Sequence, residues 1–206
     1  MSIPHDVKKL WQFIAGSQNT GSVDLIARRF LQVFLDHGIE ASQIPRLLPQ
    51  IKLDNLQHLE KLLAVLTPAI LDQTADLFGI RSPWLEGVDD EIYESRHCYK
   101  EPTLLLNHLA TLKIDTHHPF SFPLRILTTT KNLDYHNTSD QLLAPVIVEP
   151  IMELGDKWIY RYHIYRDGFN WNYEPTRIQL KVIARIVYKH FNTSVPMFVI
   201  SMKEME

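Results

Sequence analysis

Residues 67–87 read TPAILDQTADLFGIRSPWLEG, and this stretch predicts a capped helix followed by a tight bend. Thr67 is a typical N-cap, and Pro68 suits the first helical position because the N–H that proline lacks would have no partner there. Gly79 is placed to end the helix as a left-handed C-cap. Between them lies a stripe at helical spacing that we expect to face the core, formed by Ile70, Leu71, Thr74, Ala75, Leu77 and Phe78.

A second helix start follows the bend. Ser82 and Pro83 repeat the cap and the proline, and we expect Trp84 and Leu85 to fill a core before Gly87 ends the turn. A helix that is followed by the sequences FGI and SPWLEG resembles the closing helices of the Cro/repressor-like (Xre-type) helix-turn-helix domain. In that family a Trp-Leu pair seals a small helical bundle. The resemblance implies a DNA-binding transcriptional regulator.

Three more helical patterns lie upstream of this stretch. Apolar periodicity predicts helices over 23–37, 40–48 and 54–66, with Gly38 ending the first and Pro49 bounding the second. Together with the two helices above they make five, which is the number expected of a repressor-like bundle.

The chain divides into three predicted zones. Residues 1–22 hold a short amphipathic helix and a flexible turn, and residues 23–93 form the repressor-like helical domain. Residues 94–206 form a second domain, which we expect to dimerise or to sense an effector. The boundary falls within the polar stretch 88–101.

In the second domain the sequence pattern changes from helical to extended, with runs rich in β-branched and aromatic residues. Pro150 argues for an edge strand or a bulge, and Gly155 with Asp156 predicts a hairpin turn. The order of elements predicts an α+β domain with a mostly antiparallel sheet. The predicted helices span 102–112 and 175–191, and the predicted strands span 122–130, 145–154, 157–165 and 195–202.

Composition narrows the class of protein. The formal net charge is −3, so any contact with DNA has to come from a local patch. Cys98 is the single cysteine, which excludes an internal disulfide and fits a reducing cytosol. The sequence has no signal-peptide pattern and no membrane span, and we expect a cytoplasmic protein. Nucleotide-binding glycine loops, nucleophile elbows and zinc spacings are missing, so we expect no cofactor, no metal and no enzyme activity.

The resemblance places a DNA-contacting surface on the second and third helices of the bundle. Residues 41–48 would brace against phosphates, and residues 52–61 would enter the major groove. Across 23–87, however, eight acidic residues stand against six basic ones, which favours an alternative in which the bundle contacts protein instead. The predicted DNA-binding residues are Ser42, Gln43, Arg46, Lys52, Asn55, Gln57 and His58.

The helix predicted over 175–191 carries a basic residue at every fourth position, which places four cations in one stripe. The stripe is suited to a phosphate backbone or an acidic partner; alternatively, carboxylates from the sheet neutralise it. Its members are Arg177, Lys181, Arg185 and Lys189, and the expected apolar face holds Ile178, Val182, Ile183, Ile186 and Val187.

The strand over 157–165 alternates two sets of large side chains, and more aromatic residues follow it. Such a group can line a ligand pocket, and it can equally form the core of the sheet. The residues of the predicted ligand site are Arg125, Trp158, Arg161, His163 and Trp171.

These patterns together predict a regulator that binds double-stranded DNA as a homodimer, because repressor-like domains read two half-sites one helical turn apart. Its second domain would dimerise or sense a small-molecule or protein effector. One alternative is an adaptor that uses the helix-turn-helix bundle for protein contacts. Another is a small-molecule-binding protein or enzyme with its site in the aromatic sheet.

Overall fold

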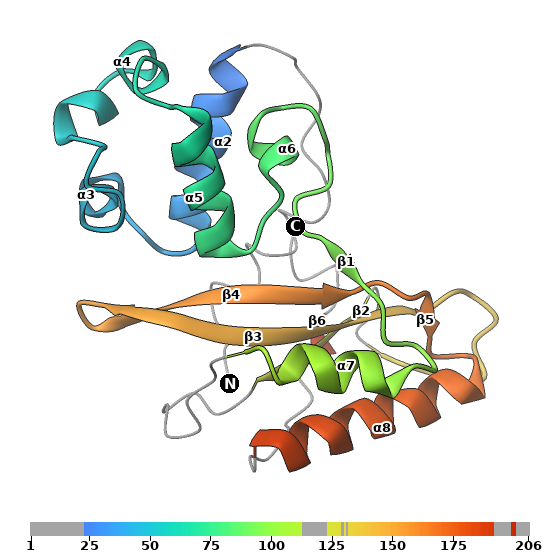
Figure 1. Cartoon of the computed structure of the whole chain (residues 1–206). Coiled ribbons are helices and arrows are strands. Elements are labelled where there is room, and N and C mark those ends of the chain that lie inside the picture. The colour runs from blue at the N-terminus through green and yellow to red at the C-terminus, as the bar shows by residue number, and fades with distance from the viewer. Residues whose placement is uncertain (1–22, 113–122, 129, 131, 192–198, 201–206) are drawn as a thin grey trace. The chain divides into compact units, whose positions relative to one another are not determined.

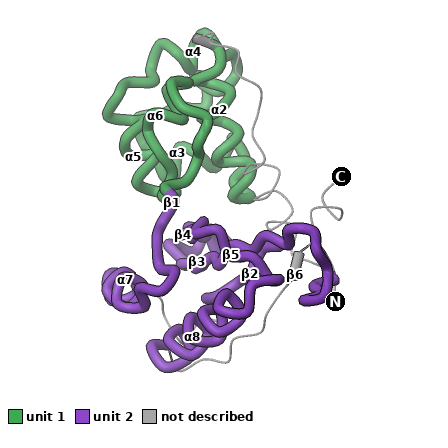
Figure 2. Tube along the Cα trace, turned by 90° about the vertical axis from the view of Figure 1, so that its right-hand side faces the viewer, with its two compact units in different colours: residues 1–94 green, residues 95–206 purple. Residues whose placement is uncertain are grey.

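The computed structural model describes residues 23–112, 123–128, 130, 132–191 and 199–200. The chain divides into two compact units, residues 1–94 and residues 95–206 (Figure 2). The helix predicted within residues 1–22 and most of the strand predicted over 195–202 lie outside the described residues.

The first unit is built from short helices in its described part. Its longest helices are α2 and α5, and two single 3₁₀ turns accompany the α-helices. The bounds are α2 Val23–Asp36, α3 Ile44–Leu47, α4 Leu59–Leu63, α5 Pro68–Phe78 and α6 Ser82–Leu85, with 3₁₀ turns at Ala41–Gln43 and Leu53–Leu56.

The capped helix α5 confirms the prediction made from its ends. The hydroxyl of Thr67 accepts a hydrogen bond from the N–H of Ile70 at 3.4 Å, and Gly79 adopts a φ of 67° as the C-cap. The prediction for α6 is wrong by one residue: Arg81 is the N-cap and Ser82 is already helical. The Ser82 hydroxyl instead donates to the carboxylate of Asp72 at 2.8 Å.

The two helices predicted over 40–48 and 54–66 are not continuous. A 3₁₀ turn precedes the four residues of α3, and Pro49 excludes further helix because the residue before a proline avoids the α conformation. The second stretch breaks at His58, whose extended φ and ψ of −140° and 140° separate the 3₁₀ turn from α4.

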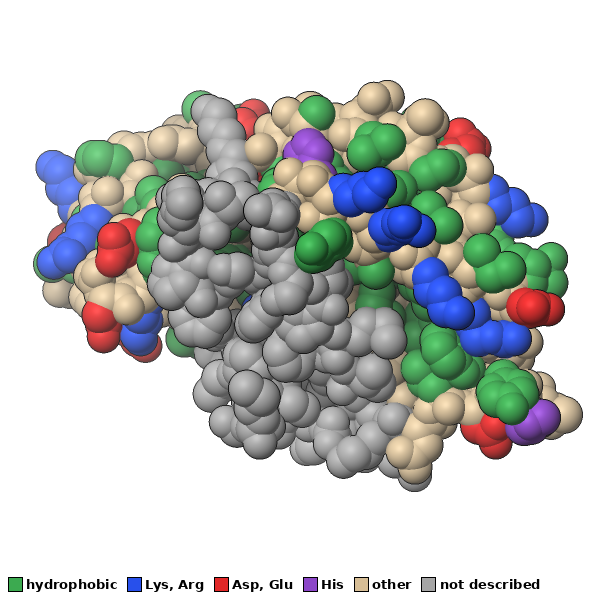
Figure 3. Space-filling model, turned by 90° about the horizontal axis from the view of Figure 1, so that it is seen from below, with side chains coloured by type: hydrophobic (Ala, Val, Ile, Leu, Met, Phe, Trp, Pro, Cys, Tyr) green, Lys and Arg blue, Asp and Glu red, His purple; other side chains and the backbone are tan. Residues whose placement is uncertain are grey.

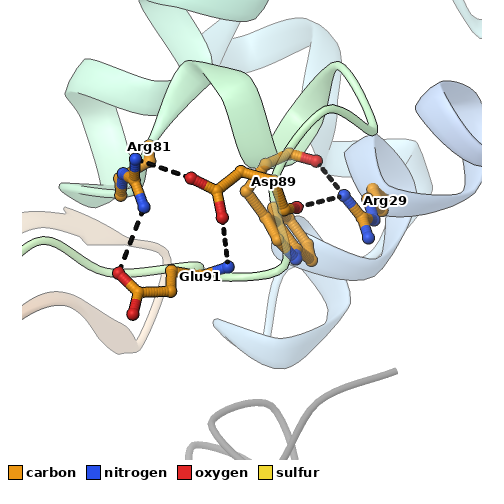
Figure 4. A network of polar contacts seen from close by, with 5 residues as sticks. Arg29, Arg81, Asp89 and Glu91 are labelled. Atoms are coloured by element: carbon orange, nitrogen blue, oxygen red, sulfur yellow. Dashed lines mark hydrogen bonds and ion pairs between the residues drawn. The ribbon is translucent and has the colours of Figure 1, made fainter. Parts of the chain in front are cut away.

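A buried arginine ties α2 to the loop that follows α6 (Figure 4). Arg29 donates to the carbonyl oxygens of Trp84 and, at 3.0 Å, of Asp89, and its guanidinium lies 4.8 Å from the centre of the Trp84 ring. Arg81 forms ion pairs with Asp89 at 2.6 Å and with Glu91 at 3.2 Å. Trp84 and Leu85 are buried, as predicted.

The second unit has the predicted α+β class. Its sheet has the strand order β1-β4-β3-β2-β6, and β5 also pairs with β3. The contacts of β3 with β2, β4 and β5 are antiparallel, whereas β1–β4 and β2–β6 are parallel. The strands are β1 Ser95–Arg96, β2 Leu124–Thr128, β3 Leu142–Leu154, β4 Lys157–Tyr165, β5 Phe169–Asn170 and β6 Val199–Ile200; the helices are α7 Pro102–Leu109 and α8 Glu174–Phe191.

The proline in β3 is accommodated by a bulge. The register with β4 shifts between Pro150 and Met152, as the bulge alternative predicted. Strand β2 pairs with β3 only from Leu143 to Ile147, so Pro150 also lies beyond the part of the strand that β2 covers. The predicted hairpin turn is present, with Gly155 at a φ of 69°.

Helices α7 and α8 cover the same face of the sheet (Figure 1). The core between them and the sheet is apolar and includes Leu105, Leu109, Leu124, Ile126, Ile147, Leu180, Ile183 and Val187. No helix among the described residues has both the length and the hydropathy needed to cross a membrane.

Candidate functional site

The segment predicted to read bases does not form one recognition helix. Residues 53–56 form a 3₁₀ turn and residues 59–63 form little more than one α-helical turn, whereas a helix-turn-helix domain inserts a continuous helix into the major groove. The side chains of Ser42, Arg46, Lys52, Gln57 and His58 are exposed, and those of Gln43 and Asn55 are half-buried.

Two of the predicted DNA-binding side chains act as local caps. The side-chain oxygen of Gln43 accepts a hydrogen bond from the N–H of Glu40 at 3.0 Å. The side-chain oxygen of Asn55 accepts one from the N–H of Lys52 at 2.8 Å. These bonds give Gln43 and Asn55 a structural role in holding the two turns.

Residues 23–94, the helical segment, contain six Lys and Arg side chains, and three of them form ion pairs within the first unit. Arg29 and Arg81 belong to the network around Asp89, and Lys61 pairs with Asp54 at 2.8 Å. Within residues 23–94, only three basic side chains lack an ion pair with a described carboxylate: Arg28, Arg46 and Lys52. The helical segment therefore offers little free positive charge to a phosphate backbone.

The basic stripe on α8 is exposed along most of its length. Lys181, Arg185 and Lys189 are solvent-exposed, and no described carboxylate forms an ion pair with them. Arg177 differs, because it donates to the carbonyl oxygen of Trp171 at 2.6 Å and lies 5.7 Å from the centre of the Tyr135 ring. A row of Lys and Arg side chains is visible on the face of the molecule drawn in Figure 3.

Apolar side chains accompany the cations on this helix. Ile178 was predicted to face the core, but it is 51% exposed, and Tyr188 is 52% exposed. The reason is the true position of the core stripe, which runs through Thr176, Leu180, Ile183, Val187 and Phe191. The exposed face of α8 therefore combines cations with one aliphatic and one aromatic side chain.

The predicted ligand residues do not converge on one place. Alternation along the strands puts Arg161 and His163 on the face that carries α7 and α8, whereas Trp158 and Arg125 point to the opposite face. Trp171 lies beyond β5, where its carbonyl oxygen binds Arg177.

Arg161 and His163 instead meet a carboxylate that sequence reasoning missed. Nε2 of His163 lies 2.9 Å from Glu149, and a guanidinium nitrogen of Arg161 lies 3.5 Å from the same oxygen. The only signal in the sequence is Glu149 itself, an acid within the apolar run 143–152, where the strand is buried on both faces around it.

A second histidine from α7 lies against this group. The rings of His108 and His163 are 4.6 Å apart, centre to centre, and Nδ1 of His108 lies 2.5 Å from the hydroxyl of Tyr165. Burial lowers the pKa of His108 to about 4, with further lowering from the charges of His163 and Arg96. Burial also lowers the pKa of His163, although Glu149 opposes the shift.

Within the described part of the chain, no group of three or more histidine, cysteine or acidic side chains is arranged to hold a metal ion. Comparison of the chain with protein-family models, with curated proteins and with solved structures finds no match.

Proposed function

We propose that the protein is a nucleic-acid-binding regulator that holds the phosphate backbone on the exposed face of α8. The observation that carries this proposal is the row formed by Lys181, Arg185 and Lys189. Like charges at four-residue spacing destabilise a helix slightly, and these three have no described carboxylate to offset the repulsion. A partner that supplies a row of negative charges compensates for that cost.

Nucleic acid fits this face better than an isolated acidic patch does. The helix has four basic residues and one acidic residue, a net charge of +3, and successive cations rise by about 6 Å along its axis. A nucleic acid offers a regular series of phosphates to such a row. Tyr188 adds an exposed ring on which a base can stack.

The test is a fluorescence-anisotropy titration with labelled duplex and single-stranded oligonucleotides at several salt concentrations. One variant combines Lys181→Gln, Arg185→Gln and Lys189→Gln. A matched control combines Arg28→Gln, Arg46→Gln and Lys52→Gln, which removes the same charge from the helical segment. We expect the α8 variant to flatten the slope of log K against log salt by about 0.9 per lost phosphate contact on duplex DNA.

The control variant should bind nearly as the wild type does. If it loses binding while the α8 variant retains it, the helix-turn-helix segment is the binder and the proposal fails. It also fails if the wild type binds no oligonucleotide at low salt. A duplex from upstream of the protein's own gene tests sequence preference, which the resemblance to Xre-type regulators leads us to expect.

A second role is proposed for the helical segment, namely protein contact. Leu53, which is 59% exposed within the segment predicted to read bases, would lie in such a contact. We propose that the partner is a second copy of the chain. The corresponding test is given with the oligomeric state below.

A further inference from the structure

The exposed face of α8 carries an aromatic ring among its cations. At about 100° of turn per residue, Tyr188 projects about 20° from Lys181 and about 60° from Arg185 around the helix axis. Tyr188 is 52% exposed. The ring and the cations therefore share one side of the helix, away from the core stripe that includes Ile183 and Val187.

The ring of Tyr188 is not occupied by another side chain in the described part of the protein. No hydrogen bond, ring stacking or cation–π contact joins it to a described residue. Tyr135 differs, although it is also exposed. Its ring centre lies 4.0 Å from that of His136 and 5.7 Å from the guanidinium of Arg177. Of these two tyrosines, Tyr188 is the one whose ring is open to a ligand.

The charge along the helix is positive around this ring. Lys181, Arg185 and Lys189 form no ion pair with a described carboxylate. Glu174 is the one acid of α8, and it lies about 10 Å along the axis from Lys181, at the other end of the helix. The helix dipole places about half a negative charge at the C-terminal end, which the three cations exceed.

The loop beside the N-terminal part of α8 carries two carboxylates, and both have partners of their own. Asp134 accepts a hydrogen bond from the N–H of His136 at 2.9 Å, and Asp140 accepts one from the side chain of Asn170 at 2.7 Å. This loop meets α8 at Arg177, which lies about 16 Å along the axis from the position of Tyr188. Its negative charge therefore belongs to the end of the helix away from the open ring.

Helix α8 does not project alone from its sheet. Helix α7 lies on the same face (Figure 1), and the N–H of Lys100, just before α7, donates to the side chain of Gln179 on α8 at 3.3 Å. The major groove of a duplex is about 12 Å wide, which is about the diameter of one helix with its side chains. A second helix packed alongside leaves no room for α8 to enter that groove, whereas a strand lying along the surface meets no such obstacle.

We propose, in a step that rests on the function proposed above, that the nucleic acid held on α8 is single-stranded. Its phosphates lie on Lys181, Arg185 and Lys189, and an unpaired base stacks on the ring of Tyr188. In a duplex the faces of the bases are already stacked on one another, so the ring would meet only the backbone. In a single strand those faces are open, and a basic surface combined with an aromatic ring holds both parts of the strand.

The test is a set of anisotropy titrations with three labelled oligonucleotides of equal length. They are oligothymidylate, the duplex that it forms with oligodeoxyadenylate, and a strand in which abasic sites replace all the bases. The abasic strand keeps the phosphates and lacks the stacking surface. At about 0.15 M salt we expect the wild type to bind oligothymidylate about fivefold or more tightly than either of the other two.

Three variants of the full chain isolate the contribution of the ring. Tyr188→Ala should weaken binding of oligothymidylate roughly five- to 150-fold and change binding of the abasic strand by no more than about twofold. Tyr188→Phe should stay within about twofold of the wild type on every strand, because stacking needs the ring and not the hydroxyl. The matched control is Tyr135→Ala, which removes an exposed tyrosine whose ring is already in contact with His136 and Arg177. It should bind oligothymidylate as the wild type does.

Any of three results would overturn the single-strand inference. The first is binding of the duplex as tightly as the single strand, or more tightly. The second is an equal loss of affinity of Tyr188→Ala for oligothymidylate and for the abasic strand. The third is a loss in Tyr135→Ala as large as that in Tyr188→Ala. In all three the protein still binds nucleic acid, and the charge variants of α8 decide the proposed function separately. If the wild type binds no oligonucleotide, the proposed function fails and the single-strand inference fails with it.

Discussion

Trp84 is the residue on which the packing of α6 depends. It is buried, and the Arg29 guanidinium covers its ring. We expect Trp84→Ala to lower the free energy of unfolding by roughly 3–5 kcal/mol, as for other buried large aromatic residues. Chemical denaturation measures this, with the exposed Leu53→Ala as the control. An unchanged midpoint for Trp84→Ala would contradict the role of this tryptophan in the core.

His37 makes the stability of the helical unit depend on pH. Its Nδ1 donates to the carbonyl oxygen of Val33 at 2.7 Å, its ring lies on Phe78, and burial lowers its pKa to about 4. The unfolded chain therefore binds more protons between pH 6.5 and 4, so stability falls as the pH falls through this window.

The expected loss is roughly 1.5 kcal/mol between pH 6.5 and pH 5 from His37 alone. His108 contributes a change of the same sign, because its pKa is lowered as well. Thermal unfolding at a series of pH values measures the sum. His37→Phe should remove the part that belongs to the helical unit; an identical pH profile in that variant would refute the assignment.

At the scale of elements, the side chains of Gln43 and Asn55 hold 3₁₀ turns. We expect Asn55→Ala to cost about 1 kcal/mol of stability, as the loss of a cap does, and to leave nucleic-acid affinity and sequence preference unchanged. Denaturation and the anisotropy titration together check this. A relaxed sequence preference without loss of stability would return Asn55 to the role of a base reader.

Local sequence signals correctly predicted the elements whose ends are marked by capping or turn residues. Thr67 and Gly79 define α5, and the alternation before and after Gly155 defines the β3–β4 hairpin. The stretch from 54 to 66 misled the prediction because leucine periodicity does not distinguish a continuous helix from a 3₁₀ turn and a short helix separated by one extended residue.

The two candidate sites also differ in how far the sequence could predict them. The stripe on α8 follows from helical spacing alone, so sequence was sufficient to find Lys181 and Arg185. The group of polar side chains around Glu149 could be predicted only in part. Arg161 and His163 were predicted, but His108 is 57 positions from the tyrosine that it contacts, and only tertiary packing brings them together.

At the scale of the molecule, the two units carry opposite charge. Residues 1–94 have a net charge of −5 and residues 95–206 a net charge of +2, although the chain as a whole has −3. We expect a homodimer at micromolar concentration through the helical segment around Leu53. Light scattering on the wild type and on Leu53→Ser measures it, and a strict monomer with and without DNA would rule the dimer out.

The bulge in β3 marks the position where we expect the loss of one codon to disturb the rest of the protein least. Ile151 is the residue left over where Pro150 pairs with Tyr160 and Met152 pairs with Ile159. Deleting it straightens the strand and leaves every other pair in place. Deleting a residue earlier in the strand, such as Val148, should slip the register and move Glu149 to the other face. Natural variation in the length of this hairpin should therefore concentrate at position 151.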